Sequence, residues 1–228
     1  MGWIKSLRKG STGIGFTFES LIGKSEDALC SPDFYDIEIK THRANSKGYI
    51  SLFNYNPIGS TSYELKRILM KYGYASPKYK NHNIINTCIY CNYPKTVGFN
   101  YRFSLDVNFK DQRVYLLIFD LNGNLIDRES YWEFKVLKQK LYAKIRYLAY
   151  IEANTKYINH IEYFKYSSIE FYILKNFNTF IYLLSISKIR ISFLASYDFN
   201  NDIVISHGVS FSIKPENIKL LFKPAHSH

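Results

Sequence analysis

The sequence is poor in cysteine, with only Cys30, Cys88 and Cys91 among its 228 residues. So small and odd a number excludes a disulfide-rich secreted scaffold and suits the reducing cytoplasm, where we expect the protein to reside. Cys88 and Cys91 form a CxxC pair, a spacing that can bind zinc or perform redox chemistry. A structural zinc ion needs two further ligands, and only Cys30 and His82 are even loosely available. We therefore interpret the pair as two buried or partly buried thiols.

The sequence also lacks a long uncharged apolar run. Its most apolar stretches, residues 114–120 and 180–194, are interrupted by charged or polar side chains, so no membrane-spanning helix is expected. Residues 1–10 are basic but contain no apolar core or small-residue cleavage site, and we expect no signal peptide. Low-complexity linkers and internal repeats are absent as well. These absences favour one domain over residues 1–228.

Acidic residues are scarce relative to basic ones. The chain has 19 Asp and Glu against 30 Lys and Arg, which gives a formal net charge of +11. Such a balance favours an anionic partner, either nucleic acid or, as the weaker alternative, an acidic membrane surface. A hydrophobic content of 46% with 18% aromatic residues excludes a disordered chain and allows a substantial core.

The patterns that are present predict a mixed α/β fold. Alternating apolar residues predict a hairpin of strands over 99–109 and 113–120, followed by a turn and a third strand at 125–128. Further strands are predicted at the following positions: 36–42, 145–153, 161–166, 188–197 and 207–213. The last two are expected to form a hairpin around the loop 198-DFNND-202.

Helices are predicted from their capping signals. Thr61 with Glu64 and Ser130 with Glu133 have the spacing of capping boxes, and Gly73 stands where a helix beginning near Thr61 would end. Residues 168–185 are predicted to form one long, largely buried helix, and a short helix is predicted to begin at Pro215. Helices and strands are therefore interleaved in a mixed α/β domain, whose meander at residues 81–129 could form a layer of its own.

The stretch 31-SPDFYDIEIKTHR-43 concentrates acidic and basic side chains. On a strand over 36–42, Glu38, Lys40 and His42 share one face, while Asp33 can fold back beside Glu38 after the turn at Pro32. Two carboxylates and an ammonium group suit a Mg²⁺-dependent phosphodiester hydrolase. The alternative is an ordinary strand with a solvated face, because this loose pattern is expected roughly once by chance in a chain of this length.

The segment upstream, 8-RKGSTGIGFTFESLIG-23, favours the chemical interpretation. A loop rich in glycine, with Ser11 and Thr12, leads into a short amphipathic helix, but the Lys-Ser/Thr continuation of a P-loop is missing. Arg8, Lys9 and the backbone N–H groups of the loop can instead contact a DNA phosphate. The helix adds Glu19, a third acid able to reach the same region.

These two blocks together resemble the active-site region of the MvaI/BcnI restriction endonucleases, relatives of the mismatch-repair nicking enzyme MutH within the PD-(D/E)xK nuclease superfamily. The resemblance implies that Asp33 and Glu38 bind the metal together with the backbone carbonyl of Ile39. It also implies that Lys40 is the catalytic lysine and that Glu19 supports the metal site. The segments 131-YWEF-134, 163-YFKYSS-168, 189-IRI-191 and 207-HGVSF-211 extend the similarity over most of the chain.

What the resemblance implies is a type II restriction endonuclease with a MutH-like fold, in which helices flank a central mixed sheet. It would act as a monomer on double-stranded DNA with Mg²⁺, for which Mn²⁺ can substitute, and would nick the two strands in turn. No obligatory protein partner is expected, and a cognate DNA methyltransferase would protect the same site in the host. The alternatives are a MutH-like repair nickase and an inactive DNA-binding module.

The same resemblance implies two lobes that form a DNA cleft. The catalytic lobe is expected mainly over about 1–80 and 130–170, and the recognition lobe over about 81–129 and 171–228.

Candidate DNA-contacting residues lie in two regions. Arg190, Asp198 and His207 fall on or near the C-terminal hairpin, although Asp198 also fits a turn residue and His207 a structural histidine. His42 and Arg43 follow the expected catalytic lysine and are candidate phosphate or base contacts, with solvated surface residues as the alternative. At two positions near the hairpin, Lys188 and Ser212 differ from the MvaI branch, so its target sequence cannot be transferred.

Overall fold

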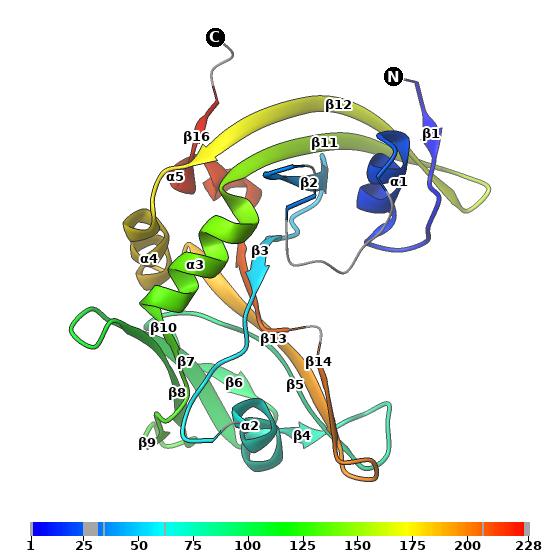
Figure 1. The fold of residues 1–228 in the computed structure, drawn as a ribbon. Coiled ribbons are helices and arrows are strands. Elements are labelled where there is room, and N and C mark those ends of the chain that lie inside the picture. Colours follow the sequence, from blue (N-terminus) through cyan, green and yellow to red (C-terminus); the bar gives the residue numbers. More distant parts are fainter. Residues whose placement is uncertain (1, 25–31, 34, 62, 207, 226–228) are drawn as a thin grey trace. The chain divides into compact units, whose positions relative to one another are not determined.

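The computed structural model of the protein describes residues 2–24, 32–33, 35–61, 63–206 and 208–225 (Figure 1). The chain forms two compact units. The first unit consists of residues 1–50, 141–176 and 214–228, and the second of residues 51–140 and 177–213. The predicted lobe boundaries differ from these units mainly at residues 51–80 and 214–228.

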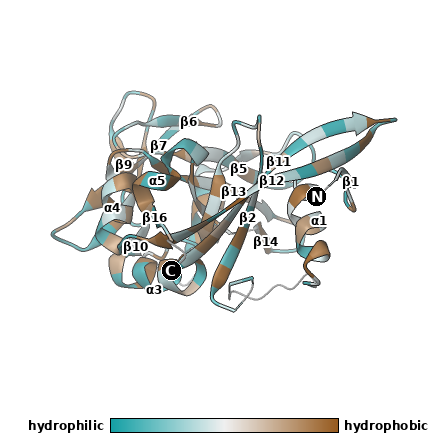
Figure 2. Ribbon diagram, turned by 90° about the horizontal axis from the view of Figure 1, so that it is seen from above, coloured by the Kyte–Doolittle hydropathy of each residue, from teal (hydrophilic) through white to brown (hydrophobic). Residues whose placement is uncertain are grey.

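The first unit is built on a five-stranded mixed sheet. Its strands lie in the order β1 (Ile4–Lys5), β12 (Ile161–Leu174), β11 (Tyr147–Ile158) and β2 (Ile37–Arg43), and β16 (Phe222–Pro224) also pairs with β12. Strand β2 runs parallel to β11, whereas the other pairs are antiparallel. Hydrophilic and hydrophobic residues alternate along the long β11–β12 hairpin, as expected for strands with two different faces (Figure 2).

The hairpin turns sharply at Asn159 and His160, both of which have positive φ angles, 49° and 61°. Two consecutive left-handed residues are what a tight two-residue hairpin turn requires, because their twist matches that of the flanking strands. The turn reverses the chain direction within two residues, so residues 161 and 162 lie beside β1 and the N-terminal loop.

Helix α1 (Gly13–Leu21) packs on this sheet. Ile14 and Phe18, one helical turn apart, enter a buried cluster with Ile39, Ile151 and Phe164. In addition, the hydroxyl group of Tyr166 donates a hydrogen bond of 2.8 Å to the carbonyl of Ile14. The core of the first unit therefore fixes α1 against β2, the strand that carries Glu38 and Lys40.

The second unit contains two sheets. One has the order β10 (Tyr131–Glu133), β8 (Arg113–Phe119), β7 (Tyr101–Asn108), β6 (Lys95–Val97), with β9 (Leu125–Asp127) beside β8. The other has the order β3 (Ile50–Asn54), β15 (Ser210–Ile213), β13 (Ile189–Asp198), β5 (His82–Ile89), β4 (Tyr74–Ala75), with β14 (Ile203–Ser206) beside β13. Helices α2 (Glu64–Tyr72) and α4 (Phe177–Ser185) pack against β13.

The remaining helices are short or cross a unit boundary. Helix α3 (Phe134–Ile145) leads from the second unit into the first, and a 3₁₀ turn η1 (Pro215–Asn217) precedes α5 (Ile218–Leu221). The mixed α/β class is confirmed, and the strands are distributed over three sheets with flanking helices. The hairpin of β7 and β8 and the helix start at Pro215 are also as predicted.

The predicted helix over 168–185 is wrong in its first part. Residues up to Leu174 continue β12, and the helix begins only at Phe177. The pattern in 168–174 fits either structure, and pairing with β11, from Ser168 opposite Glu152 to Ile173 opposite Tyr147, decides in favour of the strand.

Both predicted capping boxes are also wrong, although the helix end at Gly73 is confirmed. Helix α2 begins at Glu64 itself, whose carboxylate pairs with Arg67 and Ser130 instead of the backbone. Residues 131–133 form β10, so α3 starts only at Phe134.

Candidate active site

Strand β2 places the expected catalytic pair side by side. Because side chains two residues apart share one face of a strand, Glu38 and Lys40 project together, and the Lys40 Nζ lies 2.5 Å from the Glu38 Oε1. Glu38 is only 1% exposed, while Lys40 keeps a quarter of its side chain accessible. Between them, the Ile39 side chain is buried in the core and leaves only its backbone available to the site.

Asp33 folds back onto the same strand, as predicted. Its Oδ2 accepts a hydrogen bond of 2.9 Å from the Ile39 N–H, and its Oδ1 pairs with the Lys24 Nζ at 2.8 Å. The backbone bond ties the turn before β2 to the strand. The structure therefore brings Asp33, Glu38 and Lys40 together in one small volume.

Two further lysines belong to this cluster and were missed from the sequence. Lys24 follows α1 and pairs with Asp33, and Lys144, near the end of α3, places its Nζ 2.9 Å from the Glu38 Oε2. Lys144 is distant in sequence and carried no recognisable signal. Its position follows from the parallel pairing of β2 with β11, because β11 begins directly after α3.

The two carboxyl groups respond differently to this environment. Burial raises the pKa of Glu38 above its ordinary value, although Lys40 and Lys144 oppose that change. Burial alone would also raise the pKa of Asp33, but the hydrogen bonds from Lys24 and the Ile39 N–H, together with the other two lysines, hold it below its ordinary value. Asp33 is therefore ionised at neutral pH.

Glu19 and Lys40 line a common cavity of about 310 Å³. Glu19 comes from α1 and Lys40 from β2, and Gly15 is the residue of α1 that approaches Thr41 of β2. A Cβ atom at Gly15 would meet the Glu19 Oε1 at 3.6 Å and the Thr41 Oγ1 at 3.4 Å, so the helix approaches the strand closely there. This brings the third predicted acid to the cavity that Lys40 faces.

The glycine loop forms another wall of this cavity. Arg8, Ser11 and Thr12 line it, whereas exposed Lys9 lies on the other side of the loop, away from Lys40. The Arg8 guanidinium rests on the Phe16 ring, with its Cζ 3.9 Å from the ring centroid. Thr12 precedes α1, and its side chain makes no capping hydrogen bond.

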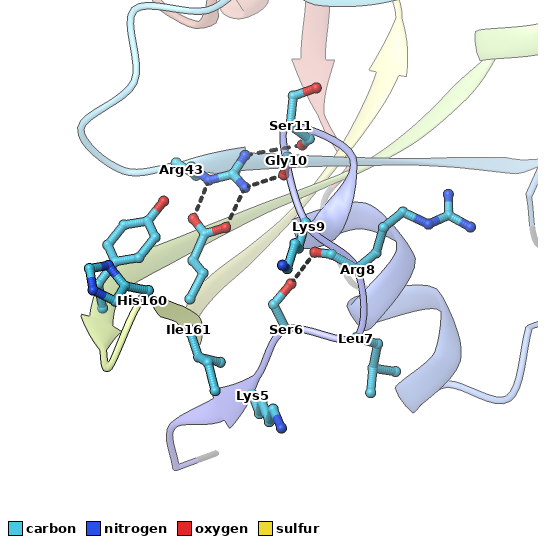
Figure 3. A pocket seen from close by; sticks show the side chains of 12 residues that line it. Lys5, Ser6, Leu7, Arg8, Lys9, Gly10, Ser11, Arg43, His160 and Ile161 are labelled. Carbon is cyan, nitrogen blue, oxygen red and sulfur yellow. Dashed lines mark hydrogen bonds and ion pairs between the residues drawn. The ribbon is translucent and has the colours of Figure 1, made fainter.

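Arg43, a predicted DNA contact, is engaged within the protein. Its Nε and Nη2 form a bidentate pair with Glu162 at 2.8 and 3.0 Å, and its Nη2 and Nη1 donate to the carbonyls of Gly10 and Ser11 respectively, both at 3.1 Å (Figure 3). The hydrogen bonds that Arg43 donates to Glu162 raise the pKa of Arg43. Arg43 therefore fastens the glycine loop to the β11–β12 hairpin.

His42, the other predicted contact in this region, is buried. It is 8% exposed, its ring stacks on Tyr150 at a centroid distance of 6.2 Å, and burial lowers its pKa. The alternative of a solvated surface residue is wrong for His42, because its side chain is buried and packs against Tyr150.

Comparison with known proteins identifies the family of this chain. The sequence model of the MvaI/BcnI restriction endonuclease family matches residues 1–222. The chain belongs to the MvaI/BcnI restriction endonuclease family. It is 31% identical to the restriction endonuclease MvaI solved as a complex with its cognate DNA substrate, with a TM-score of 0.88 over 98% of this chain and 91% of that one. For MvaI in the absence of DNA the identity is 30% and the TM-score 0.66, over 98% and 90% of the two chains. None of the curated proteins matches.

Other residues expected to contact DNA in this MvaI/BcnI family member lie in the second unit. On β13, the Arg190 Nε lies 3.4 Å from the Ser212 Oγ on β15, and the side chain is half-buried. Asp198 accepts hydrogen bonds from the Asn200 N–H and the Asn201 side chain at 2.8 and 2.7 Å, which lower its pKa and give it the geometry of a turn residue. His207 lies outside the described residues.

The remaining sequence expectations concern metals and membranes. Cys91 is buried, which raises its thiol pKa to about 12, and Cys88 is half-buried, while Cys30 lies outside the described residues. Over the described ranges, no group of three or more His, Cys, Asp or Glu side chains is arranged to hold a metal ion. The helices of those ranges include none with the length and apolar character needed to cross a membrane.

The Asp33–Glu38 pair nevertheless fits Mg²⁺. This ion is usually held by one or two carboxylates and completes its coordination with water and substrate phosphate, so three acidic side chains are not needed. Glu38 has a buried Oε2 whose neighbour is a lysine ammonium group, a cation that a metal ion can replace. Hard oxygen donors favour Mg²⁺ or Mn²⁺ over softer metals.

Proposed function

We propose that this protein is a type II restriction endonuclease that hydrolyses double-stranded DNA at a short recognition sequence with Mg²⁺. The observation that carries the proposal is the cluster of two carboxylates and three lysines in the first unit, next to the cavity lined by Glu19. Three cations facing two acids leave an excess of positive charge, which suits a phosphodiester substrate. Membership of the family supports the same reaction.

Each residue of the cluster has a distinct role in this proposal. Asp33, Glu38 and the Ile39 carbonyl would hold Mg²⁺, which supplies an activated water molecule and neutralises charge on the scissile phosphate. Lys40 contacts the attacking water and stabilises the negative charge that develops on the phosphate. Glu19 positions water on the α1 side of the cavity.

DNA binding is assigned to both units. In the first unit, Arg8, Lys9, Ser11 and Thr12 contact phosphates, and His42 and Arg43 support the loop and strand that carry them. In the second unit, Arg190, Asp198 and His207 take part in reading bases. A monomer with one such cluster cuts the two strands one after the other, and a cognate methyltransferase protects the host site.

The test is to incubate the purified protein with plasmid DNA and Mg²⁺ and to sequence the ends of the products. We expect discrete double-strand fragments with 5′-phosphates, preceded by nicked circles, and no products from Lys40→Ala. Absence of cleavage with Mg²⁺ and Mn²⁺, or full activity in Lys40→Ala, would contradict the proposal. Nicked circles as the sole product would instead indicate a MutH-like nickase.

A further inference from the structure

A second cavity lies on the other side of the glycine loop. It measures about 650 Å³ and is bounded by the N-terminal segment 5–11 and by the turn at His160 and Ile161 (Figure 3). The Arg8 side chain points away from His160, whereas Lys9 extends into the space between Ser6 and Arg43 (Figure 3).

The cavity is strongly cationic. Among the described residues that line it, Glu162 is the one acid, and it is 9% exposed and already carries the bidentate contact with Arg43. Lys5 and Lys9 are exposed, and in the described part of the chain neither forms a salt bridge. Two lysines thus remain to compensate an anion, and a concave surface lined by one sign of charge concentrates its field on such a ligand.

This cavity adjoins the candidate active site. Arg8 and Ser11 line both cavities, so the glycine loop is their common wall. Strand β2 spans them as well, since Lys40 lines the smaller cavity and Arg43 the larger one. Lys40 and Arg43 are three positions apart on the extended strand, so their Cα atoms are about 10 Å apart.

We propose that the larger cavity binds a backbone phosphate of the DNA strand being cut, through Lys5 and Lys9. Neighbouring phosphates of one strand rise about 3.4 Å along the helix axis and are also displaced around that axis, so a separation of about 10 Å places this phosphate about one or two nucleotides from the scissile one. The inference rests on the proposed function for its ligand. It adds a contact that reads no base and fixes the register of the strand over Lys40.

The first experiment measures binding without catalysis. The double variant Lys5→Gln/Lys9→Gln and the wild-type protein are titrated with a duplex of arbitrary sequence, without divalent metal, over a range of salt concentrations. Loss of two phosphate contacts should reduce the slope of log K against log salt by about 2 and weaken binding about tenfold or more at 0.1 M salt.

The matched control is Lys223→Gln. Lys223 is exposed on β16 and belongs to the same unit, but β16 pairs with the 172–174 end of β12, whereas the cavity uses residues 161 and 162 at its other end. Its slope should remain that of the wild type. An unchanged slope in the double variant, or an equal reduction per lysine in the control, would overturn the proposal.

The second experiment locates the phosphate. Single neutral methylphosphonates are placed along the cleaved strand of a duplex that carries the mapped recognition site, and binding is measured with Ca²⁺. In the wild type, a substitution about one or two nucleotides from the cut should weaken binding, and in Lys5→Gln/Lys9→Gln the same substitution should have no further effect. Equal weakening in both proteins would overturn the assignment.

The two proposals can fail separately. If the protein cuts no DNA, the salt dependence still reports whether the cavity binds phosphate. If it cuts DNA and the slope is unchanged, only the inference about the cavity is lost.

Discussion

Each unit of the molecule contains a cluster in which two carboxylates lie beside cations, and the two clusters differ in the cations they use. In the first unit, Asp33 and Glu38 face Lys24, Lys40 and Lys144, with contacts of 2.5 to 2.9 Å. All three lysines keep between 14% and 25% of their side chains exposed. Three partly accessible ammonium groups therefore face two acids in this cluster.

The cluster of the second unit has a single central cation. The Arg67 guanidinium bonds Glu64 at 2.6 Å and Asp127 at 2.6 Å. The Tyr72 hydroxyl donates a further bond of 2.6 Å to Asp127, and the Ser130 hydroxyl donates one to Glu64. Gly59 is required for this packing, because a Cβ atom there would lie 2.4 Å from the Glu64 side chain.

The difference separates a cluster suited to chemistry from one suited to structure. A guanidinium binds carboxylates through a rigid fork and holds its partners in place, whereas a lysine is a point charge on a flexible stem that can move aside. The first cluster can exchange its lysines for a metal ion and a phosphate. The second holds α2 against the strand pair of β8 and β9 and has no surplus cation to offer.

Breaking the first cluster should abolish catalysis and leave folding intact. In Asp33→Asn we expect cleavage of plasmid DNA to fall about a thousandfold, because a metal ligand contributes several kcal/mol to the transition state. The melting temperature should change little, since Asp33 is partly accessible and amide oxygen still accepts from Ile39.

The matched control for this prediction is Asp36→Asn. Asp36 lies in the same stretch but is exposed and outside the cluster. Its activity should remain that of the wild type, and equal loss in both variants would place the chemistry elsewhere.

Breaking the second cluster should have the reverse effect. Arg67→Met leaves the buried Glu64 carboxylate without its cation and Asp127 with only the Lys71 ammonium at 3.8 Å, and such a loss costs about 3–5 kcal/mol of unfolding free energy. Urea unfolding at pH 7 measures this. Arg67→Lys, which keeps the charge without the fork, should lose less and provides a folded variant if the first does not accumulate.

Lys66→Met is the control on the same helix. Lys66 pairs with exposed Asp202, and a surface pair of this kind is worth about 0–1 kcal/mol. A loss in Arg67→Met no larger than in Lys66→Met would contradict the structural role of the arginine.

Lowering the pH should weaken the second cluster, because its stability depends on the ionised form of Asp127. Burial would raise the pKa of Asp127, but the bonds from Arg67, Tyr72 and the Glu129 N–H hold it below its ordinary value. The ionised form therefore contributes stability above the unfolded-state pKa of about 3.9, and this contribution is lost as the pH falls through the lower folded-state value.

The measurement compares the wild type with Asp127→Asn between pH 7 and pH 3. The variant should be less stable at pH 7 by about 1–2 kcal/mol, and the difference should shrink as the pH falls. A difference that stays constant over this range would show that the charge of Asp127 does not matter.

The sequence predicts those parts of the site that depend on local periodicity. Glu38 and Lys40 lie two residues apart on one strand, and the turn after Pro32 returns Asp33 to them, so their meeting was predictable. Lys144 could not be found, because its contact with Glu38 depends on the parallel pairing of β2 with β11.

The predictions for Glu64 and for residues 168–174 are wrong for the same physical reason. The sequence from Thr61 to Glu64 matches the pattern of a capping box, but Arg67 and Ser130 offer the Glu64 carboxylate stronger partners. Likewise, the apolar residues of 168–174 suit a helix until the opposite strand is present. Tertiary partners overrule local preference at both places.

The smallest expected effect concerns Lys144 and tests whether the first cluster can exchange a lysine for a metal ion. In Lys144→Met, Glu38 loses one of two cations, and the metal-free protein should be less stable by about 1–2 kcal/mol. Added Mg²⁺ or Mn²⁺ should then raise the melting temperature more than in the wild type, because the ion no longer competes with an ammonium group. Lys138→Met, an exposed lysine of the same helix, is the control and should match the wild type with and without metal. If metal stabilises the wild type and Lys144→Met equally, Lys144 does not occupy the position that the ion requires, and the first cluster is as fixed as the second.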